Sequence, residues 1–107
     1  MPIQIVFHKL DPSPAIEANI RERAEKLEQY YDQIVGCRVV VEAPHKHHTK
    51  GNLYSVRIAV TVPGEELVVS RAPGEQASRE DAYVAVREAF DTMRRRLQDY
   101  ARKRRGD

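Results

Sequence analysis

The sequence predicts an α+β fold with two layers, in which two helices cover one face of a four-stranded mixed sheet. Three observations lead to this prediction. Segments with apolar residues at every second position predict strands, segments with apolar residues at three- and four-residue steps predict helices, and turns that contain Pro or Gly separate them. The order is β-α-β-β-β-α, and 107 residues suffice for a single domain over residues 1–107.

The chain begins with a strand and a helix. Residues 3–8 alternate with the period of a half-buried strand. Ser13 fits the N-cap of the following helix, and Pro14 fits its first position, where the missing N–H costs nothing. This helix is predicted to run to about residue 31, with an apolar stripe of Ile16, Ile20, Ala24, Leu27 and Tyr31.

Three further strands are predicted, at residues 37–43, 53–62 and 66–72. The polar residues 44–52 form a predicted loop, and Pro-Gly-Glu at 63–65 forms a turn. The core face of the third strand is expected to carry Tyr54, Val56, Ile58, Val60 and Val62.

The connections limit the topology. The first βαβ step is expected to be a right-handed crossover between parallel strands, and the later strands are expected to pair as antiparallel hairpins. Without the first strand, the order α-β-β-β-α is that of double-stranded-RNA-binding domains. The RRM order does not fit, and no RNP-type aromatic strand is present.

The last predicted helix spans residues 78–105. Ser78 and Asp81 have the spacing of a capping box. From residue 79 to 104 the helix would be about 39 Å long, whereas strands of seven to ten residues span roughly 23 to 33 Å. About two turns are therefore expected to extend past the sheet. The predicted apolar stripe consists of Tyr83, Val86, Phe90, Met93, Leu97 and Tyr100.

Positive charge is concentrated at the end of this helix. Residues 92–105 include seven cations and one acid, a net charge of +6, whereas the whole chain carries +2. Ion pairs four residues apart are predicted for Arg95 with Asp91 and for Lys103 with Asp99. Compensation of the helix dipole, worth under about 1 kcal/mol, does not require so many cations. The cluster therefore favours a polyanionic partner whose phosphates the arginines would bind. The arginines without an obvious acid in the helix are Arg94, Arg96, Arg102, Arg104 and Arg105.

Two other basic segments leave alternatives open. The run His45-Lys46-His47-His48, with Lys50 nearby, is either a solvated loop or a cationic loop in which both lysines contact an RNA backbone. Its Cys and His spacing matches no zinc pattern, so no metal and no cofactor is expected. In the first helix, Arg23 and Lys26 belong either to a salt-bridged solvent face or to an RNA-binding surface.

The sequence gives little support for catalysis or for a membrane location. It contains no Gly-rich phosphate loop and no nucleophile elbow. Its one cysteine, Cys37, lacks an activating neighbour in the sequence and can form no internal disulfide. No signal peptide and no apolar run of about 20 residues is present. We therefore expect a cytoplasmic, non-enzymatic protein with no small-molecule substrate.

Three motifs resemble those of the ribosome hibernation-promoting factor family, also described as ribosome-associated translation inhibitor, protein Y or sigma-54 modulation/S30EA protein. Residues 23–28 (RAEKLE) are similar to the family's K-L-x-K-L-E pattern, and residues 81–86 (DAYVAV) resemble the D-M-Y-A-A-I motif that opens its last helix. Residues 93–97 (MRRRL) are similar to its L-x-R-Q-L segment. The order and separation of these motifs agree along almost the whole chain.

This resemblance implies a factor that binds the 30S ribosomal subunit and its 16S rRNA near the decoding region, and that inhibits translation under stress. No second, dimerising domain follows residue 107, so a short form, monomeric off the ribosome, is expected. The alternative is a regulatory module whose basic helix binds an acidic protein partner. The resemblance implies rRNA contacts from Arg23, Lys26, Arg94, Arg95 and Arg96, and the family is also basic where Arg102, Lys103, Arg104 and Arg105 lie.

Overall fold

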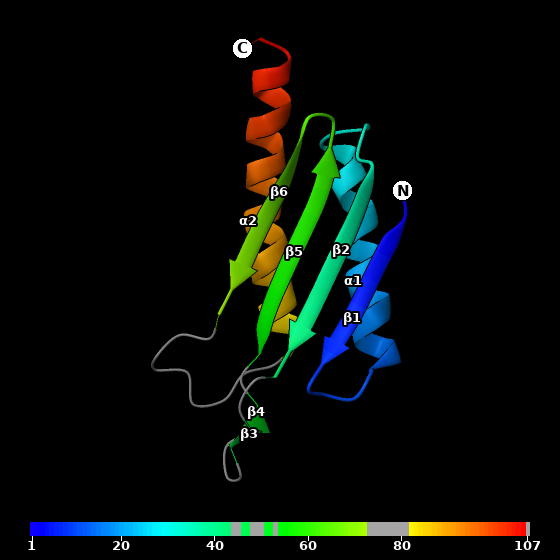
Figure 1. Ribbon diagram of the computed structural model, residues 1–107, viewed down its shortest axis with the longest axis vertical. Helices are drawn as coiled ribbons and strands as arrows, with labels where there is room; N and C mark the ends of the chain where they lie inside the picture. Colours follow the sequence, from blue (N-terminus) through cyan, green and yellow to red (C-terminus); the bar gives the residue numbers. More distant parts are fainter. Residues whose placement is uncertain (44–45, 48–50, 53, 73–81, 107) are drawn as a thin grey trace.

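Four strands form one mixed sheet with the order β1-β2-β5-β6 (Figure 1). They are β1 (Ile3–His8), β2 (Gly36–Glu42), β5 (Ser55–Val62) and β6 (Glu65–Arg71). β1 and β2 run parallel, whereas β2–β5 and β5–β6 are antiparallel, which confirms the predicted topology. The structure is a computed structural model, and it describes residues 1–43, 46–47, 51–52, 54–72 and 82–106.

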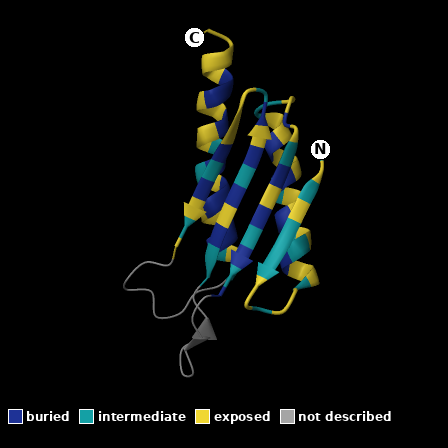
Figure 2. Ribbon diagram, in the orientation of Figure 1, coloured by how far each residue is buried: buried dark blue, intermediate teal, exposed yellow. Residues whose placement is uncertain are grey.

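Both helices lie on one face of this sheet, and the other face is open to solvent (Figure 1). Alternate residues of β2, β5 and β6 therefore differ in burial, whereas Ile5, Val6 and Phe7 of the edge strand β1 are all half-buried (Figure 2). One cross-strand row on the helix-covered face consists of Val39, Ile58 and Val69, which are in register and buried. On the open face, Arg38 and Arg57 are exposed. This alternation is the reason that the period-2 pattern located the strands correctly.

The first helix starts where the sequence predicts and ends earlier. α1 (Pro14–Lys26) is capped by Ser13, whose Oγ accepts a hydrogen bond from the Ile16 N–H at 3.2 Å. A 3₁₀ turn, η1 (Leu27–Gln29), follows, so the predicted α-helix to residue 31 is wrong at its end. The change of helix type lets the chain turn away from the α1 axis before it enters β2.

An aromatic contact between distant parts of the chain follows the end of α1. Tyr31 lies outside the helix, where the sequence predicts it on the apolar stripe, and it is only half-buried. Its ring packs edge-to-face against the ring of Tyr100, with 5.1 Å between the centroids. This contact joins the segment after η1 to the end of α2, and no local pattern encodes it.

The long helix, α2 (Ala82–Arg104), packs on β5 and β6 and continues past the β5–β6 turn (Figure 1). The predicted stripe is confirmed from Val86 onward, but Tyr83 is 41% exposed. Ala85 and Ala89 are buried instead, because small side chains allow the helix to approach the sheet closely there. Residues 102–106 are exposed, which agrees with the predicted extension. The buried residues of α2 are Ala85, Val86, Ala89, Phe90, Met93, Leu97, Tyr100 and Ala101.

The segment between β2 and β5 is not simply a loop. β3 (Lys46–His47) pairs antiparallel with β4 (Gly51–Asn52), and this short ladder lies beyond the opposite end of the sheet from the end of α2 (Figure 1). β5 begins two residues later than predicted, and Tyr54 precedes it, half-buried against the core. Residues 44, 45, 48–50 and 53 lie outside the described residues, as do Ser78 and Asp81 of the predicted capping box.

Neither α1 nor α2 could span a lipid bilayer: no helix within the described residues combines the necessary length with an apolar composition.

Replacement of Leu97 by Ala tests how strongly α2 is anchored. The Leu97 side chain is fully buried, so we expect the free energy of unfolding to fall by about 2–5 kcal/mol. Its neighbour Gln98 is exposed, and Gln98→Ala is expected to change that free energy by less than about 0.5 kcal/mol. Urea denaturation followed by circular dichroism measures both values. Equal losses in the two variants would contradict the observed packing.

Candidate nucleic-acid interface

Three adjoining hollows form a groove beside α2. On one side they are lined by residues 23–33, from the end of α1 to the segment after η1, and on the other by residues 90–105, in α2 and immediately after it. We call this depression the helix groove. Tyr30 lines all three hollows, so it lies at their junction. The groove brings together two parts of the chain that are more than 55 residues apart in the sequence.

The first hollow lies between α1 and α2 and has a volume of about 130 Å³. Arg23 and Lys26 reach it from the last turn of α1, and Arg94 reaches it from α2. Asp91 is the one acid among its lining residues. The structure thus brings together three of the cations that the sequence singled out, and the hollow carries a net positive charge.

Arg94 is incompletely satisfied in this hollow. Its Nε is buried and has no hydrogen-bond partner among the described residues. A buried donor without a partner costs about 1–3 kcal/mol, so such groups usually have a partner, in the protein or in a ligand. Among the described residues, the hydrogen bond of Arg23 to Asn19 at 3.0 Å and the ion pair of Lys26 with Glu22 at 3.2 Å are both local to α1.

The second hollow, of about 550 Å³, lies further along α2. Arg95, Arg102 and Arg105 line it together with one acid, Asp99. The predicted ion pairs of this region are wrong. Arg95 donates to Thr92 Oγ1 at 3.3 Å, and Asp99 pairs with Arg102, which the sequence left without an acid, in place of the predicted Lys103. One turn of a helix offers Asp99 partners three and four residues away, and side-chain rotamers decide between them.

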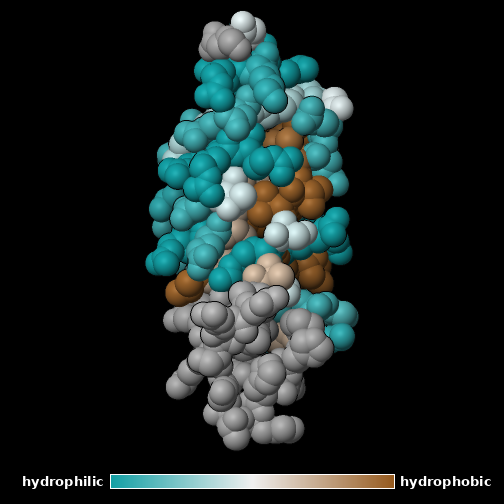
Figure 3. Space-filling view, turned by 90° about the vertical axis from the view of Figure 1, so that its left-hand side faces the viewer, coloured by the Kyte–Doolittle hydropathy of each residue, from teal (hydrophilic) through white to brown (hydrophobic). Residues whose placement is uncertain are grey.

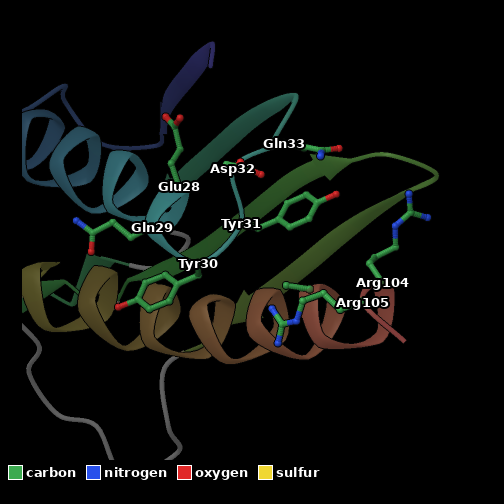
Figure 4. A pocket seen from close by; sticks show the side chains of 9 residues that line it. Glu28, Gln29, Tyr30, Tyr31, Asp32, Gln33, Arg104 and Arg105 are labelled. Atoms are coloured by element: carbon green, nitrogen blue, oxygen red, sulfur yellow. The ribbon is translucent and has the colours of Figure 1, made fainter. Parts of the chain in front are cut away.

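The third hollow, also of about 550 Å³, lies at the end of α2 (Figure 4). Figure 4 shows the Tyr31 ring between β5 and the end of α2, with Arg104 beyond it. The Arg104 guanidinium lies over the Tyr100 ring, 5.8 Å from its centroid. The Tyr100 hydroxyl donates to the Pro63 carbonyl at 2.7 Å. This aromatic cluster fixes the last turns of α2 against the sheet, and it also occupies Arg104, which the sequence left without a partner.

Two of the predicted contact residues lie on the opposite side of α2 from the helix groove. Arg96 donates to the Val68 carbonyl of β6 at 2.9 Å. Lys103 is exposed and follows seven residues later, two helical turns on, so it shares this β6 side. Figure 3 shows the molecule from the α2–β6 side, with hydrophilic residues around the end of α2. The cations of α2 therefore divide between two surfaces.

The two lysines between β2 and β5 are not part of the groove. Lys46 belongs to β3, beyond the other end of the sheet (Figure 1), and Lys50 lies outside the described residues. The histidines near them, apart from the β3 residue His47, also lie outside those residues. Within the described part of the chain, no three His, Cys, Asp or Glu side chains are grouped as a metal site requires.

Sequence reasoning missed Tyr30 and the residues that follow η1. A predicted helix through residue 31 places Tyr30 four residues after Lys26 and seven after Arg23, on the same side of the helix as these two candidate cations. The signal that sequence reasoning overlooked was this spacing, because residues four and seven apart lie on the same side of a helix. Which surface the ring then lines could be learned only from the position of α2.

Comparisons with known proteins agree with this fold. A family model described as "Sigma 54 modulation protein / S30EA ribosomal protein" matches residues 3–105. A protein of Acinetobacter guillouiae named "Ribosome hibernation promoting factor" is 34% identical over 101 residues, which cover 91% of this chain and 84% of that protein.

Two solved structures have a similar fold. The N-terminal domain of Thermus thermophilus Protein Y superposes with a TM-score of 0.72 at 21% identity, covering 94% of this chain and 99% of that one. A ribosomal subunit interface protein from Coxiella burnetii gives a TM-score of 0.73 at 18% identity, covering 94% and 98%. At these identities the two structures support the fold alone.

Cys37 is remote from the groove and chemically protected. It faces the core at 5% exposure, and burial raises the pKa of its thiol from 9.0 to about 11.

We expect slow alkylation by iodoacetamide at pH 8 in the native protein and rapid alkylation in urea, because the thiolate is the reactive form. The contribution of the neutral thiol to the free energy of unfolding is complete below about pH 9 and decreases as the pH rises towards 11. Equal native and denatured alkylation rates would contradict this assignment.

Proposed function

The chain belongs to the sigma 54 modulation protein / S30EA ribosomal protein family, and from this premise we propose that it binds the 30S ribosomal subunit through 16S rRNA near the decoding region. Bound there, it excludes mRNA and tRNA and holds the ribosome in an inactive, hibernating state under stress. Family membership identifies the protein as non-enzymatic, so it acts by occupying a surface. It works in the cytoplasm, where ribosomes are found.

One observation carries this proposal: cations from two helices converge on the helix groove. Arg23 and Lys26 from α1 meet Arg94 from α2, and Arg95 continues the row along the groove. Phosphate oxygens are suitable partners for these groups because a guanidinium donates two parallel hydrogen bonds. The unsatisfied Nε of Arg94 is a donor that a phosphate oxygen would satisfy.

The fold supplies rigidity for such binding. The cations project from helices that are packed on a sheet, and the aromatic cluster around Tyr100 fixes the final turns of α2. A rigid, preorganised surface loses little conformational entropy when it binds. The names of relatives agree with a ribosomal partner, since the Acinetobacter guillouiae protein is named a ribosome hibernation promoting factor.

Binding to the ribosome is expected to depend steeply on salt. If about six phosphates are neutralised, the affinity for 30S subunits should fall roughly a thousandfold between 50 and 200 mM salt. Sedimentation of the protein with purified 30S subunits through sucrose gradients measures this dependence. A protein that stays at the top of the gradient at 50 mM salt would sink the proposal. Nuclease-resistant recovery of one acidic protein from a lysate would favour the protein-partner alternative.

Charge reversal on the groove side should weaken this binding selectively. The pair Lys26→Glu and Arg95→Glu changes two exposed groove cations, so we expect at least about a tenfold loss of 30S affinity and a salt slope smaller by about 2. Inhibition of translation in a purified system should fall in parallel. Chemical footprinting of 16S rRNA tests the placement near the decoding region.

The matched control is the pair Arg96→Glu and Lys103→Glu on the β6 side of α2, which changes the net charge by the same amount. It should retain most of the affinity and the wild-type salt slope. Equal losses in the two pairs would mean that net charge, and not the helix groove, governs binding.

A further inference from the structure

Tyr30 holds a central position in the helix groove. It caps η1, where its N–H donates to the Leu27 carbonyl at 3.0 Å. Its side chain is half-buried and packs against the core at the junction of the three hollows. The phenol oxygen has no hydrogen-bond partner among the described residues, in contrast to that of Tyr100.

The two tyrosines after η1 have different surroundings. Tyr31 turns toward the end of α2 and packs against Tyr100. Tyr30 lies above α2 and lines the groove (Figure 4). Both side chains are half-buried, but the ring of Tyr31 is engaged by another aromatic ring, whereas within the described residues Tyr30 has no such ring contact.

Positively charged side chains lie on both sides of Tyr30. The first hollow contributes three cations and one acid, and the second hollow contributes three arginines and one acid. An aromatic ring between two basic surfaces is the arrangement found where proteins bind single-stranded nucleic acid, with phosphates on the cations and a base on the ring. Charged and polar residues together form most of the lining of the three hollows, unlike that of the mostly apolar pockets that bind small molecules.

We propose that Tyr30 is a base-stacking residue: one unstacked RNA base lies on its ring, and the phosphates on either side of that base lie on the cations of the first two hollows. This inference rests on the proposed RNA-binding function and specifies its substrate class. The bound RNA has a single-stranded or extruded nucleotide at Tyr30, because the bases of a continuous duplex are not exposed for stacking. Every base has a π face, so the site accepts any of the four.

The first test compares two RNA probes of equal length, a 12-nucleotide oligouridine and a 12-base-pair RNA duplex, by fluorescence anisotropy at fixed salt. Tyr30→Ala should weaken binding of the single strand about 5- to 150-fold, with an unchanged salt slope, because no phosphate contact is removed. Tyr30→Phe should retain the affinity, since the ring remains. The duplex affinity should change by less than about twofold in both variants.

Two controls separate stacking from structural damage. Tyr30→Leu keeps apolar packing on the core but lacks an aromatic face, so it should fold and bind the single strand as weakly as Tyr30→Ala. Tyr83→Ala removes an exposed tyrosine near the start of α2, outside the groove, and should leave binding unchanged. Thermal unfolding identifies any variant that fails to fold.

Several results would overturn the inference. The wild-type protein could prefer the duplex, or polyglutamate could displace the RNA probe as effectively as unlabelled RNA does. Tyr30→Leu could bind the single strand with wild-type affinity, or Tyr30→Phe could bind it as weakly as Tyr30→Ala. Sedimentation with 30S subunits, run in parallel, keeps the two proposals distinct. Suppose that the wild type sediments with 30S subunits, and that the Tyr30 variants bind the single strand with the same affinity as the wild type. In that case only the stacking role fails. If the wild-type protein does not sediment with 30S subunits, the proposed function fails.

Discussion

The packing of α2 on the sheet is the constraint on which the rest of this structure depends. Met93 and Leu97 are fully buried on β5 and β6, and this fixes the rotation of the helix about its own axis. Because successive residues of a helix are about 100° apart, that rotation assigns each neighbouring cation to a side. Arg94 is directed to the helix groove and Arg96 to β6. If the apolar stripe were shifted by one residue, every cation of α2 would point to a different side of the helix.

The same helix serves two purposes along its length. From Ala85 to Ala101 it completes the core, and beyond Ala101 it is exposed. The transition is stabilised by Tyr100, which combines a ring contact with Tyr31 and a hydrogen bond to Pro63. This cluster holds the basic end of the helix in a defined direction, where an isolated helix end would fray. Rigidity there is useful for recognising a surface whose charges have fixed positions.

Local contacts occupy some of the cations and leave others available. Arg102 has Asp99, Arg104 has the Tyr100 ring, and the exposed pair of Lys26 with Glu22 is worth little in water. Arg94 differs, since its buried Nε lacks a partner within the described residues. Family membership and the unsatisfied donor are independent observations, one from the chain as a whole and one from a single atom. Family membership supports a ribosomal partner, and the unsatisfied donor is one observation behind the proposed phosphate contacts at the helix groove.

The sequence by itself determined the strands, the two helices, the topology and the concentration of charge in α2, because periodicity and turn residues act over a few positions. Tertiary structure alone decided the end of α1, the exposure of Tyr83 and the partners of the arginines. The groove itself joins Arg23 and Tyr30 to Arg94 and Arg95, which are far apart in the chain. Such a surface depends on the relative placement of two helices, which hydrophobic packing across the sheet sets and no local pattern encodes.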